Sequence, residues 1–343
     1  MFASYGSEYP DLALEIELMQ RREIPPGWDR YLPVFPADAK GLAGLDASGK
    51  TLNVLAQNIP WFLGGSSDLG PSNKTLLTFE GAGDFQADTP GGKNLHFGIR
   101  EHAMAAIVNG LSLSKLRPYG ASFFIFSDYA RPSMRLAALM ELPSLFIFTH
   151  DAMGDGEDGP THQPIEQLSS LRAIPGLVTL RPADANEVVE AYRYIVQLRH
   201  EPAVLVLSRQ PLPTLDRNKY APASGVSHGA YVLADASGGN PEAINHRLRK
   251  RGQSGCPCPR NAASRRHSLA ACLHAVMGDF RATAKDLSEQ CPPPSCEGAS
   301  CCGTGFHLRL GTIRRRRREC YRHEHFRRFG SSQGTAKKVR VRT

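Results

Sequence analysis

Short apolar runs alternate with helix-length segments between residues 45 and 244, and this alternation restricts the fold more than any other feature of the chain. Four runs have the length of buried strands, at residues 121–126, 144–149, 177–180 and 203–207. Four segments have a helical period, at residues 48–58, 101–113, 129–140 and 185–198. The alternation predicts an α/β fold, a doubly wound and mostly parallel sheet with helices on both faces.

The segment before this region has a different character. An amphipathic helix is expected over residues 12–22, and prolines are frequent in residues 25–36. Proline fixes φ and lacks a backbone N–H, so we expect residues 25–36 to form an extended, packed linker rather than a helix or strand.

Composition changes sharply after Ile244. Residues 1–244 hold 19 Lys and Arg, 27 Asp and Glu and no cysteine, whereas residues 245–343 hold 22 Lys and Arg, 6 Asp and Glu and all eight cysteines. The net charge of +8 therefore combines −8 in residues 1–244 with +16 in residues 245–343, so the basic character belongs to the last part only. We divide the chain into residues 1–44, 45–244 and 245–343. No apolar run has the length of a membrane span and no signal peptide is evident, which favours a cytoplasmic protein without a membrane partner.

The loops that follow the predicted strands carry the candidate functional residues, because parallel sheets bind ligands at the carboxyl ends of their strands. His150 and His162 lie in one such loop with four carboxylates, Asp151, Asp155, Glu157 and Asp158. This combination suits proton transfer or the recognition of hydroxyl groups. A solvated acidic loop is the alternative.

Two further patterns have two interpretations each. Phe123, Phe126 and Tyr129 recur at a spacing of three, which is typical of a core and also of a wall for a flat ring. Glu101 begins a predicted helix, where the helix dipole favours a carboxylate whether or not it has a function.

Residues 44–51 match the phosphate-binding pattern GxxxxGK[ST]. That loop requires an apolar strand immediately before it, and the prolines upstream predict that no such strand is present. We therefore expect an N-capped helix here, with nucleotide binding as an alternative function.

Five segments together resemble the transketolase family. They are GGSSDLGPSN (64–73), FGIREHAMAAIVNG (97–110), PYGASFFIFSDY (118–129), THDAMGDGEDGPTHQPIEQ (149–167) and LSRQPLP (207–213). The resemblance runs from about Pro10 to Ile244 and covers the family's pyrimidine-binding domain with the linker before it. It implies transfer of a two-carbon ketol unit between sugar phosphates, with thiamine diphosphate and Mg²⁺, in the pentose phosphate pathway or the Calvin cycle.

The resemblance also implies roles for individual residues. Glu101 matches the glutamate that hydrogen-bonds the aminopyrimidine ring, and His162 matches the histidine near the reacting carbon, so both are expected to be catalytic. The other cofactor contacts are expected from Asp68, Phe123, Phe126 and Tyr129. Substrate contacts are expected from Ser72, His150, Asp158 and Arg209.

Two departures from the family affect this interpretation. Leu45 stands where the family has a phosphate-binding arginine. The diphosphate-binding domain, which holds Mg²⁺ in the family, is expected before Pro10 and is not found, so we expect no metal ligand in this chain. Residues 154–156 with Asn186 imitate the metal motif, but Asn186 begins an ordinary amphipathic helix. We expect half of an active site, completed within a homodimer or by a separate chain that carries the other domain.

Residues 245–343 have two interpretations. Their charge alone suggests a nucleic-acid-binding tail, without the aromatic residues or zinc-finger spacing that specific binding needs. However, codons for residues 245–253 that are read one base later can spell TIASGSEV, and residues 277–302 and 322–334 can likewise spell segments that resemble the third transketolase domain. We therefore predict a disordered tail that is translated out of frame and has no specific nucleic-acid partner.

Overall fold

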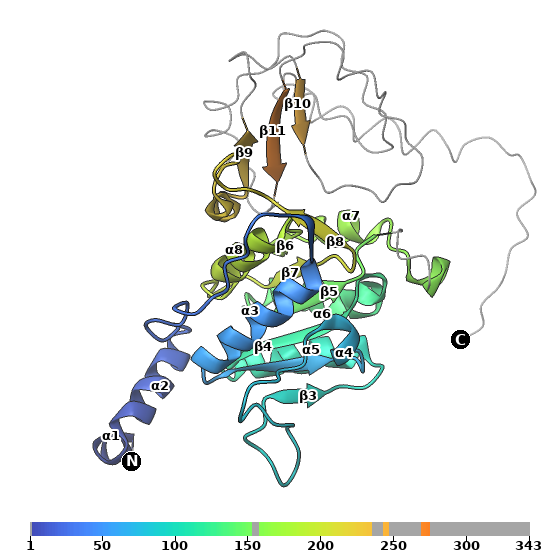
Figure 1. The fold of residues 1–343 in the computed structure, drawn as a ribbon. Helices are drawn as coiled ribbons and strands as arrows, with labels where there is room; N and C mark the ends of the chain where they lie inside the picture. Colours follow the sequence, from blue (N-terminus) through green and yellow to red (C-terminus); the bar gives the residue numbers. More distant parts are fainter. Residues whose placement is uncertain (1, 153–157, 235–242, 247–268, 275–343) are drawn as a thin grey trace, which may run out of the picture. The chain divides into compact units, whose positions relative to one another are not determined.

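Six parallel strands form the central sheet, in the order β3-β2-β4-β5-β7-β6 (Figure 1). The computed structural model describes residues 2–152, 158–234, 243–246 and 269–274. The strands of the sheet are β2 (Phe62–Ser66), β3 (Asn94–His96), β4 (Arg117–Phe123), β5 (Leu145–Thr149), β6 (Val178–Leu180) and β7 (Ala203–Val206). Because all the pairs are parallel, the carboxyl ends of the strands share one edge of the sheet, where a ligand site is expected.

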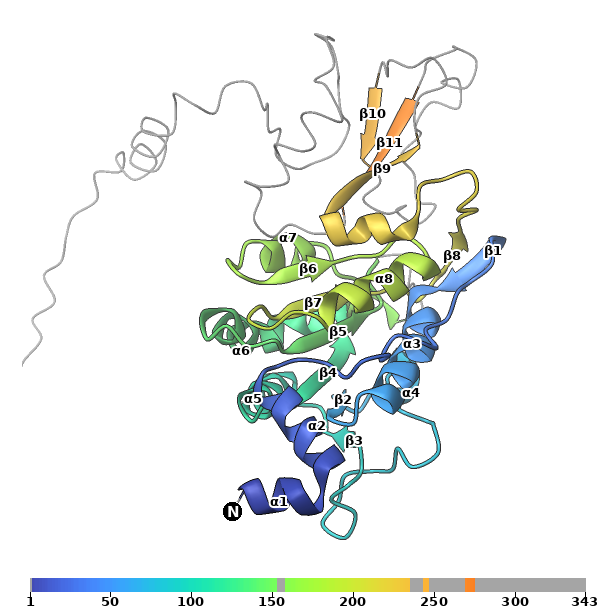
Figure 2. The ribbon, with the colours of Figure 1, turned by 90° about the vertical axis from the view of Figure 1, so that its left-hand side faces the viewer.

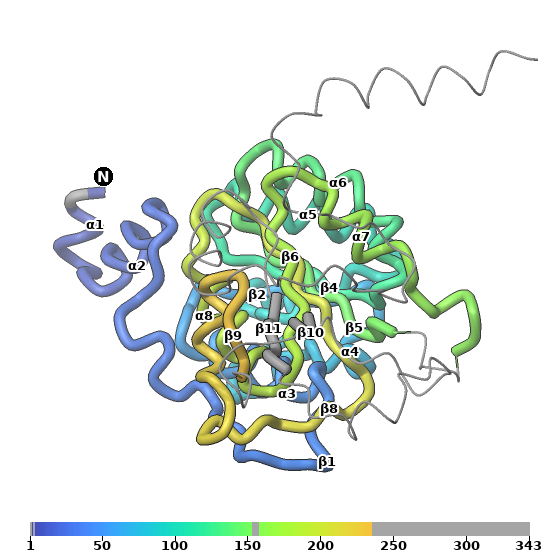
Figure 3. Tube along the Cα trace, turned by 90° about the horizontal axis from the view of Figure 1, so that it is seen from above, coloured from blue at the N-terminus to red at the C-terminus, as the bar shows by residue number. Residues whose placement is uncertain are grey.

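Helices cover both faces of this sheet. One face packs against α3 (Gly44–Asn58) and α8 (Ala185–Ile195), and the other against α5 (Glu101–Leu113), α6 (Ser127–Leu139) and α7 (Gln167–Arg172). Figures 2 and 3 show the two groups of helices on opposite sides of the strands. The predicted α/β fold with a doubly wound, mostly parallel sheet is confirmed.

Strand β5 shows how the sequence produces this arrangement. Leu145 and Ile147 belong to the core cluster under α3 and α8, whereas Phe146 and Phe148 belong to the cluster under α5, α6 and α7. Side chains alternate across a strand, so both faces of β5 are buried and its sequence is apolar throughout.

The predicted elements are present with small shifts. The helix predicted over residues 101–113 has the same bounds as α5, and the other three helices in the sheet region differ by a few residues at one or both ends. The strand predicted over residues 121–126 ends at Phe123, because Phe124–Phe126 form the 3-10 turn η1. Strands β2 and β3 were not predicted, since one contains two glycines and the other has only 3 residues.

Helices α1 (Phe2–Glu8) and α2 (Pro10–Gln20) precede the linker. Residues 23–37 contain neither helix nor strand. Leu32 is buried in the cluster under α3 and α8, and Trp28 and Phe35 pack against the same cluster. The Asn186 side chain binds the backbone of Phe35 at both amide atoms, with distances of 3.0 Å and 2.9 Å.

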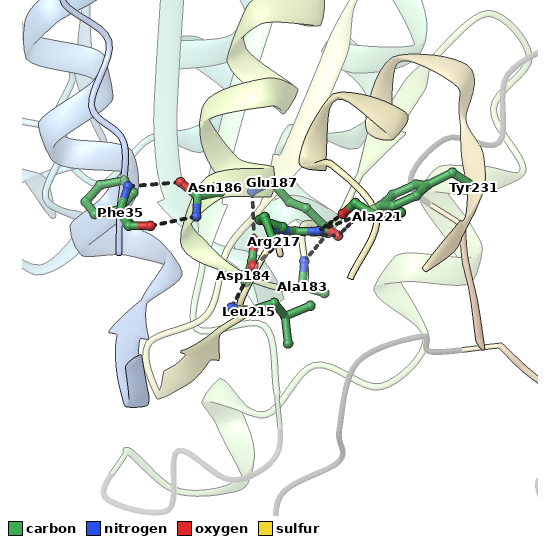
Figure 4. Close-up of polar contacts among 9 residues, drawn as sticks. All are labelled: Phe35, Ala183, Asp184, Asn186, Glu187, Leu215, Arg217, Ala221 and Tyr231. Carbon is green, nitrogen blue, oxygen red and sulfur yellow. Dashed lines mark hydrogen bonds and ion pairs between the residues drawn. The ribbon is translucent and has the colours of Figure 1, made fainter. Parts of the chain in front are cut away.

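A buried polar network fixes the start of α8 (Figure 4). Asp184 caps the helix by accepting from the Glu187 N–H, and it accepts a second bond from the Leu215 N–H. Arg217 lies 2.7 Å from Asp184 and donates to the hydroxyl of Tyr231, which in turn donates to Glu187. Burial raises the pKa of Glu187. The network joins α8 to the chain that follows the central sheet.

That chain continues through η4 (Ala223–His228) to a second sheet. Its three strands are β9 (Ala230–Ala234), β10 (Ala243–His246) and β11 (Leu269–His274), in the order β10-β11-β9. The rest of the predicted tail lies outside the described residues, so its disorder and its reading frame stay predictions. Within the described ranges, no helix is long and apolar enough to cross a membrane.

Candidate active site

The candidate residues lie where the chain leaves the carboxyl ends of the strands. Asp68 follows β2, Phe123 ends β4, and His150 follows β5. Asp68 and His150 have φ angles of 61°, in the left-handed region that non-glycine residues seldom occupy. Such conformations persist only where the surrounding structure holds them in place, and they cluster at functional sites.

Two glycines allow β2, the strand that precedes Asp68, to lie close to its neighbours in the sheet. A Cβ atom at Gly64 would lie 2.2 Å from the Tyr119 carbonyl oxygen, and one at Gly65 would lie 1.7 Å from that of Leu95. Only glycine allows β2 to approach its two neighbours this closely. The pair Gly64-Gly65 therefore positions the residues that follow it.

Glu101 is the first residue of α5, and its side chain is buried. The Ser122 hydroxyl donates a hydrogen bond of 2.8 Å to its Oε1 atom. The positive end of the helix dipole also favours a carboxylate here. No hydrogen bond to Oε2 is found among the described residues.

The three predicted aromatic residues form a continuous series of rings. Phe123 and Phe126 are stacked with centroids 6.0 Å apart, and Phe126 and Tyr129 follow at 6.1 Å. The turn η1 makes this possible, because it bends the chain between the end of β4 and the start of α6. Tyr129 is 64% exposed, so this series includes a large open aromatic surface.

Both candidate histidines contact these rings. The His150 ring lies 3.9 Å from the Phe123 ring, centroid to centroid. His162, in the turn η3 (Pro160–His162), packs edge-on against Phe126 at 5.1 Å and against Phe123 at 6.0 Å. The structure thus brings together two histidines that are twelve residues apart in the sequence.

The electrostatic surroundings of His150 include three other candidates. Burial, with smaller contributions from Arg209 and His162, lowers the pKa of His150 from 6.5 to about 4. Asp158 acts in the opposite direction, but its contribution is smaller than that of burial. His150 is therefore a neutral imidazole at physiological pH, able to exchange hydrogen bonds with uncharged groups.

Ser72 lies in the short helix α4 (Gly70–Asn73) and is exposed. The next residue, Asn73, is buried and accepts a hydrogen bond from the hydroxyl of Thr149, beside His150. The segment that carries Asp68 and Ser72 is therefore attached directly to the loop that carries His150.

Sequence reasoning did not identify Ser122, Asn73 or Thr149. Each is a small polar residue adjacent in sequence to a candidate, and each lies inside one of the five segments quoted above. Their hydrogen bonds join residues that are 21 and 76 positions apart in sequence, which no local pattern reports.

A strand does precede residues 44–51, but it is mostly exposed and is not the apolar strand that a phosphate-binding loop requires. Strand β1 (Asp38–Ala43) ends directly before them, paired antiparallel with β8 (Pro211–Thr214). The motif itself is helical from its first residue, and the Gly44 and Leu45 N–H groups bind Ser208. No loop is left between strand and helix to surround a phosphate, so the geometry does not favour nucleotide binding here.

No cluster of three or more potential metal ligands occurs among the described residues. Residues 154–156, which imitate a metal motif, lie outside them. Asn186, its proposed counterpart, has both amide atoms bound to Phe35.

Comparisons with known proteins match the central part of the chain. The family profile described as "Transketolase, pyrimidine binding domain" matches residues 40–214. A transketolase of Bacillus subtilis is 50% identical over 244 residues, which make up 71% of this chain and 36% of that protein. Among solved structures, transketolase from Leishmania mexicana matches with a TM-score of 0.72 at 33% identity, over 80% of this chain and 40% of that one.

Transketolase from Campylobacter jejuni matches with a TM-score of 0.64 at 41% identity, over 79% of this chain and 40% of that one. The chain thus spans well under half the length of each of these relatives.

Proposed function

The chain belongs to the transketolase family, and from this premise we propose that its carboxyl edge forms the pyrimidine half of a thiamine-diphosphate site. The reaction would be transfer of a two-carbon ketol unit between sugar phosphates. The observation that carries the proposal is the buried Glu101 carboxylate, bonded to β4 beside the aromatic series that begins at Phe123.

These residues fit the aminopyrimidine ring in shape and in chemistry. A flat heteroaromatic ring stacks on aromatic faces, and here Phe126 is half-buried and Tyr129 is exposed. A carboxylate accepts a hydrogen bond from a ring N–H, and the Oε2 atom of Glu101 is available for it. When bound, thiamine diphosphate supplies the electron sink for breaking a carbon–carbon bond next to a carbonyl.

The protein's own contribution would be to hold and orient the groups that contact the cofactor and the sugar. Ser122 fixes the Glu101 carboxylate, and Phe123 fixes the rings of both histidines. His162, which packs edge-on against Phe126 and Phe123, would move protons on the sugar hydroxyls. His150, which is neutral, would exchange hydrogen bonds with the substrate.

The sugar phosphate would reach Asp158, Arg209 and Ser72 around this centre. Arg209 offers a planar guanidinium suited to a phosphate. Leu45 is 5% exposed and apolar, so it cannot replace the arginine that the family has at this position. We propose that phosphate binding depends more strongly on Arg209 here than in relatives with both groups.

The diphosphate and Mg²⁺ would be held by a diphosphate-binding domain, outside the matched residues 40–214. That domain would belong to a second subunit of a homodimer or to another chain in the cytoplasm. The proposed site lies between two domains, so its completion is a binding event that can be measured.

The test is cofactor binding by the full chain mixed with a separately produced diphosphate-binding domain of a relative, with Mg²⁺ present. We expect saturable binding that Glu101→Gln weakens by at least about tenfold, the equivalent of one hydrogen bond to a charged group. Glu80→Gln, at an exposed position, serves as the matched control. Equal binding by the Glu101→Gln variant and the parent chain would contradict the assignment of Glu101.

A further inference from the structure

Gln167, the first residue of α7, joins the end of the loop that carries His162 to the start of α6. Its Nε2 atom donates a hydrogen bond of 2.8 Å to Oδ2 of Asp128, and its Oε1 atom accepts one of 2.9 Å from the backbone N–H of Ile165. Gln167 is 1% exposed, so its amide group is shielded from water. Both ends of a buried amide are thus satisfied by the chain itself.

The two partners determine how the Gln167 amide is oriented. An ionised carboxylate such as that of Asp128 can only accept a hydrogen bond, and a backbone N–H such as that of Ile165 can only donate one. An amide turned by 180° would place a donor against a donor and an acceptor against an acceptor. Gln167 therefore has one orientation in which both bonds form.

A second contact repeats this connection three residues further along both helices. Arg131 of α6 donates to the hydroxyl and to the carbonyl oxygen of Ser170 in α7, at 2.7 Å and 3.1 Å. Residues three apart lie on the same face of a helix. The two contacts therefore set the position of α7 along α6.

The elements that are joined in this way carry groups of the candidate site. Helix α6 begins directly after Phe126, and α7 begins shortly after the turn η3 with His162. The His162 ring packs edge-on against the Phe126 ring at 5.1 Å. Among the described residues, the only hydrogen bond of the His162 side chain is to Thr161, its neighbour in the same turn. The position of this ring relative to α6 therefore depends on the ring contacts and on the bonds at the end of the loop.

We propose that Gln167 and Asp128 are positioning residues for His162, because their hydrogen bond holds the turn η3 against the aromatic series. The catalytic part of this inference rests on the proposed function, whereas the position of the ring does not. A displacement of a reacting group by about 1 Å can cost about 100-fold in rate. Loss of the bond should therefore lower kcat far more than it changes the affinity for the cofactor, which is assigned to Glu101 and the aromatic rings.

The first experiment uses the full chain, labelled with ¹⁵N and ¹³C at histidine, without cofactor or sugar. We expect nuclear Overhauser effects between the ring protons of His162 and Phe126 in the parent chain, and His162→Gln identifies the histidine signals. Gln167→Glu places a carboxylate against that of Asp128, so these effects should weaken. They should return when Asp128→Asn is added, because the asparagine amide can donate to the new carboxylate and the bond forms with the opposite polarity.

The second experiment measures ketol transfer by the same variants, each mixed with the diphosphate-binding domain of a relative and Mg²⁺. Gln167→Glu should lower kcat by about tenfold or more and leave the affinity for the cofactor within about twofold of the parent. The double variant should recover most of the loss in kcat. Ser169→Ala, at an exposed position of the same helix, is the matched control.

Unchanged ring contacts in folded Gln167→Glu would overturn the proposal, as would a kcat equal to that of the parent or a double variant as impaired as the single one. Asp128→Ala gives a second measurement should Gln167→Glu fail to fold. It removes the same hydrogen bond from an exposed position, so it should also weaken the ring contacts.

A parent mixture that transfers no ketol unit would contradict the proposed function, and the ring contacts would still decide whether Gln167 positions His162. The failure of this inference and the failure of the proposed function therefore give different results.

Discussion

Ser122 and Glu101 are joined by a hydrogen bond of 2.8 Å, although 21 residues separate them in sequence. Ser122 lies on β4 immediately before Phe123, and Glu101 opens α5. The bond therefore fixes the carboxylate to the same strand that carries the first ring of the aromatic series. The distance between the carboxylate and the rings is set by β4 rather than by a loop.

We predict that Ser122→Ala weakens cofactor binding to the reconstituted site. The change leaves Oε1 of Glu101 buried without its donor, which costs about 1.5–3 kcal/mol for a bond to a charged group. Ser122→Thr is expected to retain most of the affinity for the cofactor, because threonine keeps the hydroxyl group. Titration with thiamine diphosphate measures the effect, and Ser224→Ala, at an exposed position, is the control. Affinity equal to the parent in Ser122→Ala would show that the bond does not position the carboxylate.

We predict that His150 makes the chain less stable as the pH falls below about 6.5. Its pKa is about 4 in the folded chain and 6.5 ordinarily, so the unfolded chain binds more protons between these values. Stability is therefore highest above pH 6.5 and falls as pH approaches 4, by up to about 3 kcal/mol. Urea unfolding at several pH values measures this slope.

His150→Gln removes the titrating group, so the slope of the unfolding free energy against pH should fall by the equivalent of about one bound proton. His200→Gln is the comparison, because that residue is far from the site in sequence and follows α8 on the surface. A slope that is the same in His150→Gln and in the parent chain would contradict the prediction.

We predict that Arg217→Met strongly destabilises the fold. Arg217 pairs with Asp184 at 2.7 Å, and the Asp184 side chain is 0% exposed. Removal of one partner from a buried pair leaves an uncompensated charge and costs about 3–5 kcal/mol. Removal of the Lys219 side chain, which pairs with Asp216, is the control. That side chain is 77% exposed, so its loss should change the free energy of unfolding by less than about 1 kcal/mol. Thermal unfolding of both variants makes the comparison, and equal midpoints would refute the role of the network.

The central sheet could be predicted because its strands have a distinctive composition. Phe146 and Phe148 face one layer of helices while Leu145 and Ile147 face the other, so β5 is an uninterrupted apolar run. Strand β2 has no such signal. Its Gly64 and Gly65 are required because Tyr119 and Leu95 lie very close to them, which is a tertiary constraint. In the sequence, however, a pair of glycines resembles a turn.

The site could be predicted in part. Chemically reactive residues such as Glu101 and His162 occur in patterns that a reader of the sequence can notice. Thr149 and Ser122 have no pattern of their own, since their role depends on partners from another element. The strand before residues 44–51 was missed for a related reason: β1 is largely exposed and pairs with β8, more than 160 residues away, so it lacks an apolar run.

We predict that Gly65→Ala destabilises the chain, because Gly65 lies where β2 leads into the candidate site. Gly65 is paired with Leu95 of β3, and a Cβ atom would lie 1.7 Å from the Leu95 carbonyl oxygen. In Gly65→Ala the two strands must separate, so we expect a loss of about 3 kcal/mol or more in the free energy of unfolding. Gly110→Ala, in α5, is the matched control, because a Cβ atom there meets nothing within 4 Å. Alanine at that helical position should stabilise the chain by up to about 1 kcal/mol.

The same substitution should affect the site before the chain unfolds. Asp68 lies three residues after Gly65, and Asn73 follows in α4 with its bond to Thr149. A shift of β2 moves both, so the ¹⁵N signals of His150 should change in Gly65→Ala at temperatures where the chain is still folded. Chemical denaturation and histidine spectra of the two alanine variants provide the measurements. Stability within about 0.5 kcal/mol of the parent in Gly65→Ala would mean that the close approach of β2 to β3 is not required, because surface-like substitutions fall in that range.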